Sequence, residues 1–209
     1  PRVFPNGWEQ RNRSLIGAGA DLTGAVLKNE DLNGLDFTDV GLTNAVLTNA
    51  KTGTINGSPM LLPNGWEQRN KSLIGRGADL TDAVLKGEDL NGLDFTGADL
   101  TNADFSSATL VGTDFFNSIL LGANFENADL SYANFENADL AGMSLKNTNL
   151  QGADFTGADL TNVDLTGANL TDAILDSAVV GGITSFLSFQ TQDEKAVLTS
   201  ASNTIMNLQ

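Results

Sequence analysis

Large apolar residues recur along this chain every five positions, a period that belongs to neither a helix nor a strand. From Leu80 to Leu175 every fifth residue is Leu or Phe over 20 positions, and a shorter run does the same from Leu22 to Leu47. On a helix each step would rotate by about 140°, so no face would collect them. On a strand an odd step would send successive residues to opposite faces. The pattern predicts a solenoid, a chain that turns once per repeat and points one large residue inward each time.

The residues between these centres fit the same picture. Two positions before the centre, Ala occupies 13 of the 20 repeats of the long run, as a narrow tube would require. Asp or Asn stands between this Ala and the centre, and Thr, Asn, Ser and Gly follow it. These polar residues form turns, because Gly and Asn accept positive φ and Asx side chains bond their own turn.

The motif Ala-(Asp/Asn)-(Leu/Phe)-X-X, as in "GADLT", "GANFE" and "NADLS", resembles that of the pentapeptide-repeat proteins. The resemblance covers roughly residues 20–50 and 78–180. It implies an all-β fold, a right-handed quadrilateral β-helix with four repeats in each coil of about 20 residues. Together with the "PNGW" interruptions, it also implies a bacterial, cyanobacterial-like origin.

The aromatic residues independently indicate four repeats per coil. Phe95, Phe115, Phe135 and Phe155 stand four repeats apart from one another, so they would stack as a ladder on one side of the tube. We expect the structural core to include Leu80, Leu85, Leu90, Phe95, Phe115, Phe135, Phe155 and Leu175.

One module occurs twice in the chain. The phrase "PNGWEQRN" stands at 5–12 and again at 63–70, and it holds both tryptophans, Trp8 and Trp66. Because each copy precedes a repeat array, we interpret the phrase as an entry segment and each Trp as a plug over the following coil. An exposed binding anchor is the alternative for these tryptophans. The segment at 42–57 also resembles 170–185, which indicates a common exit segment.

The entry segments, arrays and exit segments divide the chain into five parts. They are an entry or capping segment (1–20), a short array (21–50), an irregular excursion with the second entry (51–77), the main array (78–180), and an exit segment with a C-terminal helix (181–209). Since the offset between the two modules is not a multiple of five, the excursion must leave the coil and rejoin it, as a loop or short hairpin. The tail has a capping box at Thr191 and Glu194 and apolar residues near one helical face. We expect this helix to cap the last coil; a dimer interface or the start of a further domain are alternatives.

Composition excludes several classes of function. The chain has 11 basic and 26 acidic residues, a net charge of −15, so it has too few cations to bind a nucleic-acid backbone directly. It has no Cys and no His, which excludes thiol nucleophiles, Ser-His-Asp triads, zinc sites and disulfides. We predict no cofactor and no metal, although carboxylates could still build a hard-cation site. A membrane span is not predicted, because no apolar run reaches about 20 residues.

Six acidic residues are candidate site residues. Asp79, Asp99, Asp139 and Asp159 would lie on one side of the tube, in coils about 4.8 Å apart. They form either an acidic face that imitates DNA or collects cations, or a set of turn-forming residues. Glu30 and Glu88 take inward positions, where a buried charge costs several kcal/mol unless paired. They are either metal or acid–base groups, or partners of Arg11, Arg13, Arg69 or Lys71.

We therefore predict a non-catalytic structural or protein-interaction solenoid that is part of a longer repetitive protein. Its partner would be an unidentified protein, or a second copy through the C-terminal helix or the coil ends. Enzyme activity is not expected, since nothing marks out one carboxylate pair. The alternative follows from the resemblance, which implies a DNA-mimicking binder of a type II topoisomerase such as gyrase.

Overall fold

The computed structural model describes residues 9–11 and 14–181. Its four named strands form two short antiparallel hairpins, with Gln10 opposite Leu15 in the first and Gln68 opposite Leu73 in the second. The strands are β1 (Glu9–Arg11), β2 (Ser14–Ile16), β3 (Glu67–Arg69) and β4 (Ser72–Ile74). The part of the chain that the structure describes contains no helix. The predicted C-terminal helix and Trp8 lie outside the described residues.

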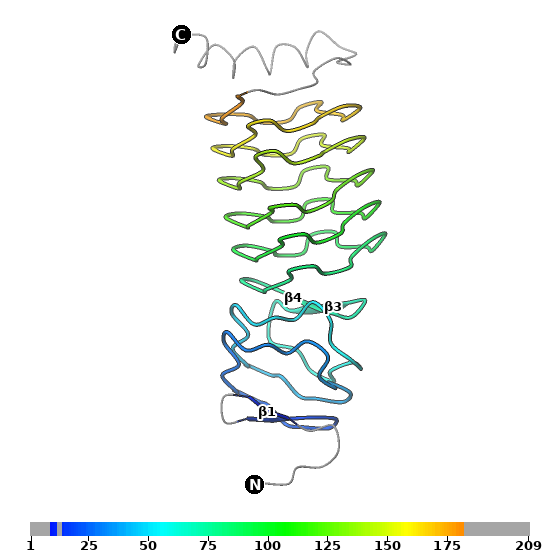
Figure 1. Ribbon diagram of the computed structural model, residues 1–209, viewed down its shortest axis with the longest axis vertical. Coiled ribbons are helices and arrows are strands. Elements are labelled where there is room, and N and C mark those ends of the chain that lie inside the picture. Colours follow the sequence, from blue (N-terminus) through cyan, green and yellow to red (C-terminus); the bar gives the residue numbers. More distant parts are fainter. Residues whose placement is uncertain (1–8, 12–13, 182–209) are drawn as a thin grey trace.

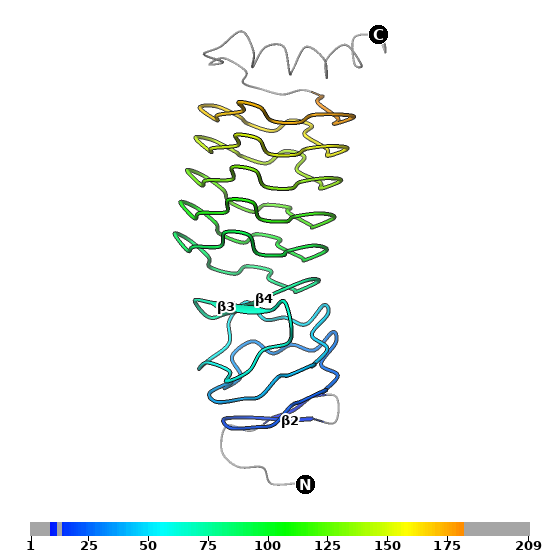
Figure 2. The same cartoon turned by 180° about the vertical axis from the view of Figure 1, so that it is seen from behind.

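Most of the chain is a column of stacked coils (Figures 1 and 2). Isolated parallel bridges join equivalent positions of successive coils, such as Asp79 with Asp99. Each coil offers four bridge positions, one in every repeat, for example Asp79, Val84, Asp89 and Asp94. Between coils the backbone is hydrogen-bonded, since the N–H of Asp99 donates to the carbonyl of Ala78 at 2.9 Å. The architecture is a β-helix in which four repeats make one coil.

A tight turn separates neighbouring repeats. In a typical turn the N–H of Ala83 donates to the carbonyl of Leu80 at 3.0 Å, and Asp82 between them has a φ of 59°. A positive φ at the third residue is typical of a type II turn, which explains the Gly, Asn and Asp residues there. Tyr132 is an unusual occupant, with a φ of 58°. Its ring lies over Gly152 of the next coil, where a Cβ would come within 2.6 Å of it.

The core is a continuous stack of inward Leu and Phe side chains. The rings of Phe95, Phe115, Phe135 and Phe155 stack with centroids 5.3, 4.9 and 5.1 Å apart. Rings on the adjacent side meet this stack edge-on, at 5.7 Å between Phe115 and Phe125. Offset or edge-on packing of aromatic rings is favourable beyond the area it buries. All eight side chains expected in the core are at most 5% exposed: Leu80, Leu85, Leu90, Phe95, Phe115, Phe135, Phe155 and Leu175.

The two arrays join directly into one column. Lys51 at the end of the first array bridges Asp79 at the start of the second. The N–H of Asp79 donates to the carbonyl of Ala50, and the N–H of Thr52 to the carbonyl of Asp79, both at 3.0 Å. Trp66 is half-buried and packs against the apolar cores of both arrays. The excursion between the arrays rejoins the coil through the hairpin of β3 and β4 (Figure 1).

The coil extends further into residues 51–77 than the five-residue rhythm indicates. Asn56 bridges Asp36, and Leu61 bridges Gly41, in the same register as the other coils of the column. At the inward position where Leu or Phe is expected, the chain has Thr52, which is fully buried. Its hydroxyl donates to the carbonyl of Leu73 at 2.8 Å. A polar residue fits there because this bond satisfies it.

Candidate interaction surfaces

The four aspartates of the predicted acidic face all take part in their own turns. Each Oδ1 accepts a hydrogen bond from the backbone N–H two residues later. The distances are 3.2 Å for Asp79, 3.0 Å for Asp99, 3.1 Å for Asp139 and 2.8 Å for Asp159. The backbone N–H therefore occupies one carboxylate oxygen at each position, which is a structural role for these residues.

These aspartates lie in one row along the column, and the row is interrupted. Asp79 bridges Asp99 and Asp139 bridges Asp159, but Ile119 stands between the two pairs. The side chain of Ile119 is 52% exposed, and that of the nearby Leu121 is 66% exposed. The acidic face consists of two aspartate pairs with an apolar gap between them.

The other rows contain one further stacked pair of carboxylates, Asp94 with Asp114. An Asn lies directly over an Asp in several coils, and its amide donates to the carboxylate below. Asn134 donates to Asp114 at 3.0 Å, and Asn149 to Asp129 at 3.1 Å. Like charges placed directly opposite each other destabilise a sheet. Of the three stacked aspartate pairs that bridges join in the described residues, two therefore lie in the row that runs from Asp79 to Asp159.

Turn hydrogen bonds also keep some of the carboxylates ionised in acid. The hydroxyl and N–H of Thr166, with Lys146 at 3.0 Å, lower the pKa of Asp164 from 3.8 to about 2. Hydrogen bonds from the Thr23 hydroxyl and N–H lower the pKa of Asp21, and Thr38 lowers the pKa of Asp36 in the same way. Each of these bonds favours the charged form.

Glu30 and Glu88 are half-buried rather than fully enclosed. Two of the predicted basic partners bind elsewhere, since Arg11 forms an ion pair with Glu9 and Arg69 with Glu67, each at 2.5 Å. Arg13 lies outside the described residues. Within residues 9–11 and 14–181 neither Glu30 nor Glu88 forms a salt bridge. That same part of the chain has no group of three acidic residues that could hold a metal ion.

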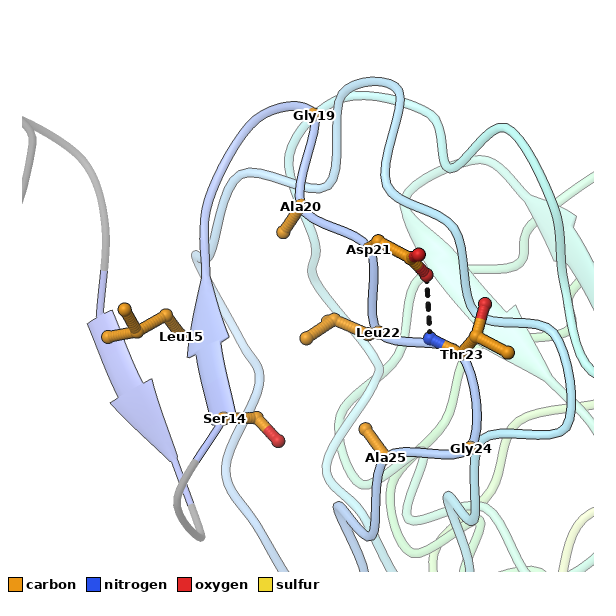
Figure 3. A pocket seen from close by; sticks show the side chains of 9 residues that line it. All are labelled: Ser14, Leu15, Gly19, Ala20, Asp21, Leu22, Thr23, Gly24 and Ala25. Carbon is orange, nitrogen blue, oxygen red and sulfur yellow. Dashed lines mark hydrogen bonds between the residues drawn. The ribbon is translucent and has the colours of Figure 1, made fainter.

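An open depression lies beside the first hairpin, at the N-terminal end of the column (Figure 3). It has a volume of about 510 Å³ and is lined by Ser14, Leu15 and residues 19–25. Leu15 is 37% exposed at its edge. Asp21 on the coil side accepts the N–H of Thr23 at 3.0 Å. The five-residue pattern contains no sign of this surface, and the nearly identical second copy of the module does not indicate it either.

A smaller depression of about 230 Å³ adjoins Trp66, at the edge of the hairpin of β3 and β4. Its lining includes Ile74, Leu93 and Asp94. The indole lies directly over Gly75 and leaves no room for a Cβ there. The role of Trp8 and Trp66 as plugs stays a prediction. Among the described residues, no helix has the length and apolarity to cross a membrane.

The repeats match the family model of pentapeptide repeats in eight copies, over residues 18–51, 78–115, 108–146 and 142–176. The chain belongs to the pentapeptide-repeat family. The matched segments cover more than half of the chain and leave out the excursion between the two arrays. No curated protein matches the sequence.

Solved structures of other pentapeptide-repeat proteins are similar to this chain. HetL of the cyanobacterium Nostoc sp., involved in heterocyst differentiation regulation, is 28% identical over 80% of this chain and 68% of its own, with a TM-score of 0.38. A pentapeptide-repeat protein of the Arabidopsis thaliana thylakoid lumen is 26% identical over 56% of this chain and 77% of its own, with a TM-score of 0.29. A trypsin-treated variant of QnrB1, a plasmid-mediated fluoroquinolone resistance protein, is 19% identical over 90% and 97%, with a TM-score of 0.35.

Proposed function

We propose that this chain is a non-catalytic structural solenoid that interacts with other proteins and forms part of a longer repetitive protein. The observation that carries the proposal is that the conspicuous polar residues serve the fold itself. Asp99 accepts the N–H of Thr101, and Asn149 donates to Asp129 of the neighbouring coil. Membership of a generally non-catalytic family supports the same conclusion. The duplicated module supports a repetitive parent chain.

The proposal includes finer features of the fold. The coil is quadrilateral, as the four bridge positions in each coil support, and right-handed, as the resemblance to the family implies. A C-terminal helix within 181–209 caps the last coil. The chain is divided into the five segments that the sequence predicts, and residues 51–77 connect the two arrays.

A second function is favoured by the two aspartate pairs. Asp79 with Asp99, and Asp139 with Asp159, resemble spaced backbone charges on one side of a rod. The row runs from Asp31 to Val179 through seven successive bridges, a height of about 34 Å. That height equals about ten base pairs of DNA. A chain with this surface would bind a type II topoisomerase such as gyrase in place of DNA.

A supercoiling assay with gyrase separates the two functions. For a structural solenoid we expect no inhibition and no drug protection at micromolar protein. Inhibition that disappears in the Asp79→Asn, Asp99→Asn double variant would overturn this expectation and support DNA mimicry. The matched control is Asp104→Asn with Asp114→Asn, which removes the same charge from other rows of the column.

A further inference from the structure

We propose that the N-terminal end of one chain receives the C-terminal end of a second copy, so that copies associate head to tail. We call residues 14–25, around the depression in Figure 3, the entry face, and residues 177–181 the exit edge. The inference rests on the proposed function as an interaction solenoid and names its partner, a second copy of this chain.

The chain contains one example of this contact within itself. Residues 72–83 are the second copy of the entry face, with the same "SLIG" and "GADLT" phrases as residues 14–25 apart from single changes. They receive residues 49–53, which end the first array. The N–H of Asn49 donates to the carbonyl of Gly77 at 2.6 Å, and that of Asp79 to the carbonyl of Ala50 at 3.0 Å. Ser72 adds a side-chain bond, its hydroxyl donating to the carbonyl of Gly53 at 2.8 Å.

The two copies of the entry face differ in what covers them. Leu73 is fully buried at the internal junction, whereas its equivalent Leu15 is 37% exposed. Ser72 is 1% exposed and Ser14 is half-buried. The same side chains on the same hairpin are thus covered in one place and open in the other. The difference is the segment at 49–53, for which the described residues at the N-terminal end contain no equivalent.

The exit edge is more exposed than its equivalent at the internal junction, residues 49–53. Residues 49–53 align with 177–181, within the resemblance of 42–57 to 170–185. Ala50 and Thr52 are fully buried beneath the second module, but the equivalent residues Ala178 and Val180 are only half-buried. Both surfaces of the internal junction therefore recur, uncovered by any described residue, at opposite ends of the column (Figure 1).

The backbone groups needed for pairing are present on both sides. By analogy with the junction, the N–H of Asp21 donates to the carbonyl of Ala178, and the N–H of Ser177 to the carbonyl of Gly19. Gly53 approaches the second array closely, since a Cβ there would lie 3.5 Å from the Cβ of Ala83. Its equivalent, Gly181, keeps the same small size. Pairing of open β edges between chains is a general route to association.

Three positions differ between residues 49–53 and 177–181, and none of the changes opposes the contact. Ser177 replaces Asn49, Val179 replaces Lys51 and Val180 replaces Thr52, so no charge enters the interface. Val180 cannot form the hydrogen bond that the Thr52 hydroxyl donates to the carbonyl of Leu73. Each chain has a net charge of −15, so the copies repel each other. We expect association to strengthen as salt screens this repulsion.

Cysteine pairing tests the arrangement in the full chain, which has no cysteine of its own. In the junction, Leu73 donates its N–H to the carbonyl of Thr52 at 3.1 Å, so the equivalent Leu15 and Val180 of two copies would be neighbours. A chain with Leu15→Cys and Val180→Cys should form a ladder of disulfide-linked dimers, trimers and larger species under mild oxidation. The control, Leu15→Cys with Leu121→Cys, moves one thiol to the side of the column. Absence of a ladder, dimers only, or an equal ladder in the control would overturn the proposal.

Reversible association supplies a second readout, measured by sedimentation velocity. Val180→Thr restores the hydroxyl of Thr52 and should tighten association about fivefold, the effect of one net hydrogen bond. Leu15→Lys places a charge in the contact and should weaken association by about tenfold or more. Val179→Lys introduces the residue found at the equivalent exposed position, Lys51, and should not lower the affinity of association. Equal affinity in all three variants would contradict the proposal.

The outcome is distinguishable from failure of the proposed function. If no ladder forms and gyrase is not affected, the proposal of head-to-tail pairing is wrong, but the proposed function as a structural solenoid stands. This result would also point to a different occupant of the entry face, such as a preceding module of a longer chain. Gyrase inhibition that depends on the aspartate pairs would overturn the proposed function whether or not a ladder forms.

Discussion

The hairpins of β1 with β2 and of β3 with β4 have the same strand sequences and the same local structure. Glu9 pairs with Ile16 in the first, and Glu67 with Ile74 in the second. The arginine contacts are repeated too, because Arg11 donates to the carbonyl of Asp31 at 3.2 Å and Arg69 to that of Asp89 at 3.0 Å. Local sequence is therefore sufficient to determine the hairpin and its position over the coil that follows it.

Burial separates the two hairpins. All three residues of β4 are buried, whereas in β2 only Ile16 is. The difference arises from residues 49–53, which end the first array and lie against β4. Identical residues should consequently contribute different amounts to stability, and paired substitutions in the two hairpins can test this.

The largest difference is expected for the leucines. Leu73→Ala removes a fully buried side chain from the core of the first array and should lower the free energy of unfolding by about 2–5 kcal/mol. Leu15→Ala should cost less than about 1 kcal/mol, because Leu15 is already 37% exposed. Urea unfolding of both variants at low protein concentration measures the gap. Equal losses would contradict the assignment of different burial to the two sites.

A smaller effect on stability is expected at Thr52, in the segment 49–53 that covers β4. Thr52→Val leaves the carbonyl of Leu73 without its hydroxyl partner and should cost about 1–3 kcal/mol. The reverse change at the other end, Val180→Thr, should leave the stability of the dilute chain nearly unchanged. Thermal and urea unfolding of the two variants provide the comparison. A neutral Thr52→Val would indicate that this hydrogen bond is not formed.

The serines should repeat the contrast on a smaller scale. Ser72→Ala removes the bond to the carbonyl of Gly53 at a buried position and should cost about 1 kcal/mol. Ser14→Ala, at the half-buried equivalent position, should change stability by less than about 0.5 kcal/mol. Both values come from the same unfolding experiment, and a larger loss at Ser14 would reverse the predicted order.

Acid should weaken both modules gradually. The pKa of Asp164 is lowered from 3.8 to about 2, and the pKa values of Asp21 and Asp36 are lowered as well. A carboxyl whose pKa is lower in the folded state stabilises the fold fully above 3.8 and loses that effect as the pH falls toward 2. Unfolding midpoints measured down this range should therefore decrease. Asp164→Asn should reduce the dependence of the midpoint on pH, because Asn has no carboxyl to titrate. The turn should remain, since Asn169 accepts the same turn bond. An unchanged dependence on pH would exclude Asp164 as a contributor.

The sequence was sufficient to predict the regular part of the molecule. A five-residue rhythm leaves little choice of inward residue, and the spacing of Phe115 and Phe135 is enough to place their rings on one side. Turn chemistry is equally local, so the role of Asp99 follows from its position before Leu100. The turns depend on residues within one repeat, and the ring stack depends on a regular spacing of four repeats.

Features that depend on distant contacts were not predictable in the same way. Thr52 breaks the rhythm yet occupies the core, because Leu73 supplies an acceptor from a distant part of the chain. By contrast, the expected pairing of Arg11 and Arg69 with Glu30 and Glu88 overlooked a local contact, because these arginines form ion pairs with Glu9 and Glu67 in their own strands. The open entry face has nearly the same sequence as the covered one, so only the three-dimensional structure distinguishes them.

The central claim is that one entry face is covered within the chain and the other is available to a second copy. Hydrogen exchange of the backbone amides at increasing protein concentration tests it most directly. Residues 72–83, including the Asp79 N–H bonded to Ala50, should exchange slowly at every concentration. The N–H groups of Asp21 and Ser177, which donate to no described backbone carbonyl, should exchange rapidly in dilute solution and become protected together as concentration rises. Equal protection of Asp21 and Asp79 in dilute solution, or no dependence on concentration at Asp21, would contradict the account.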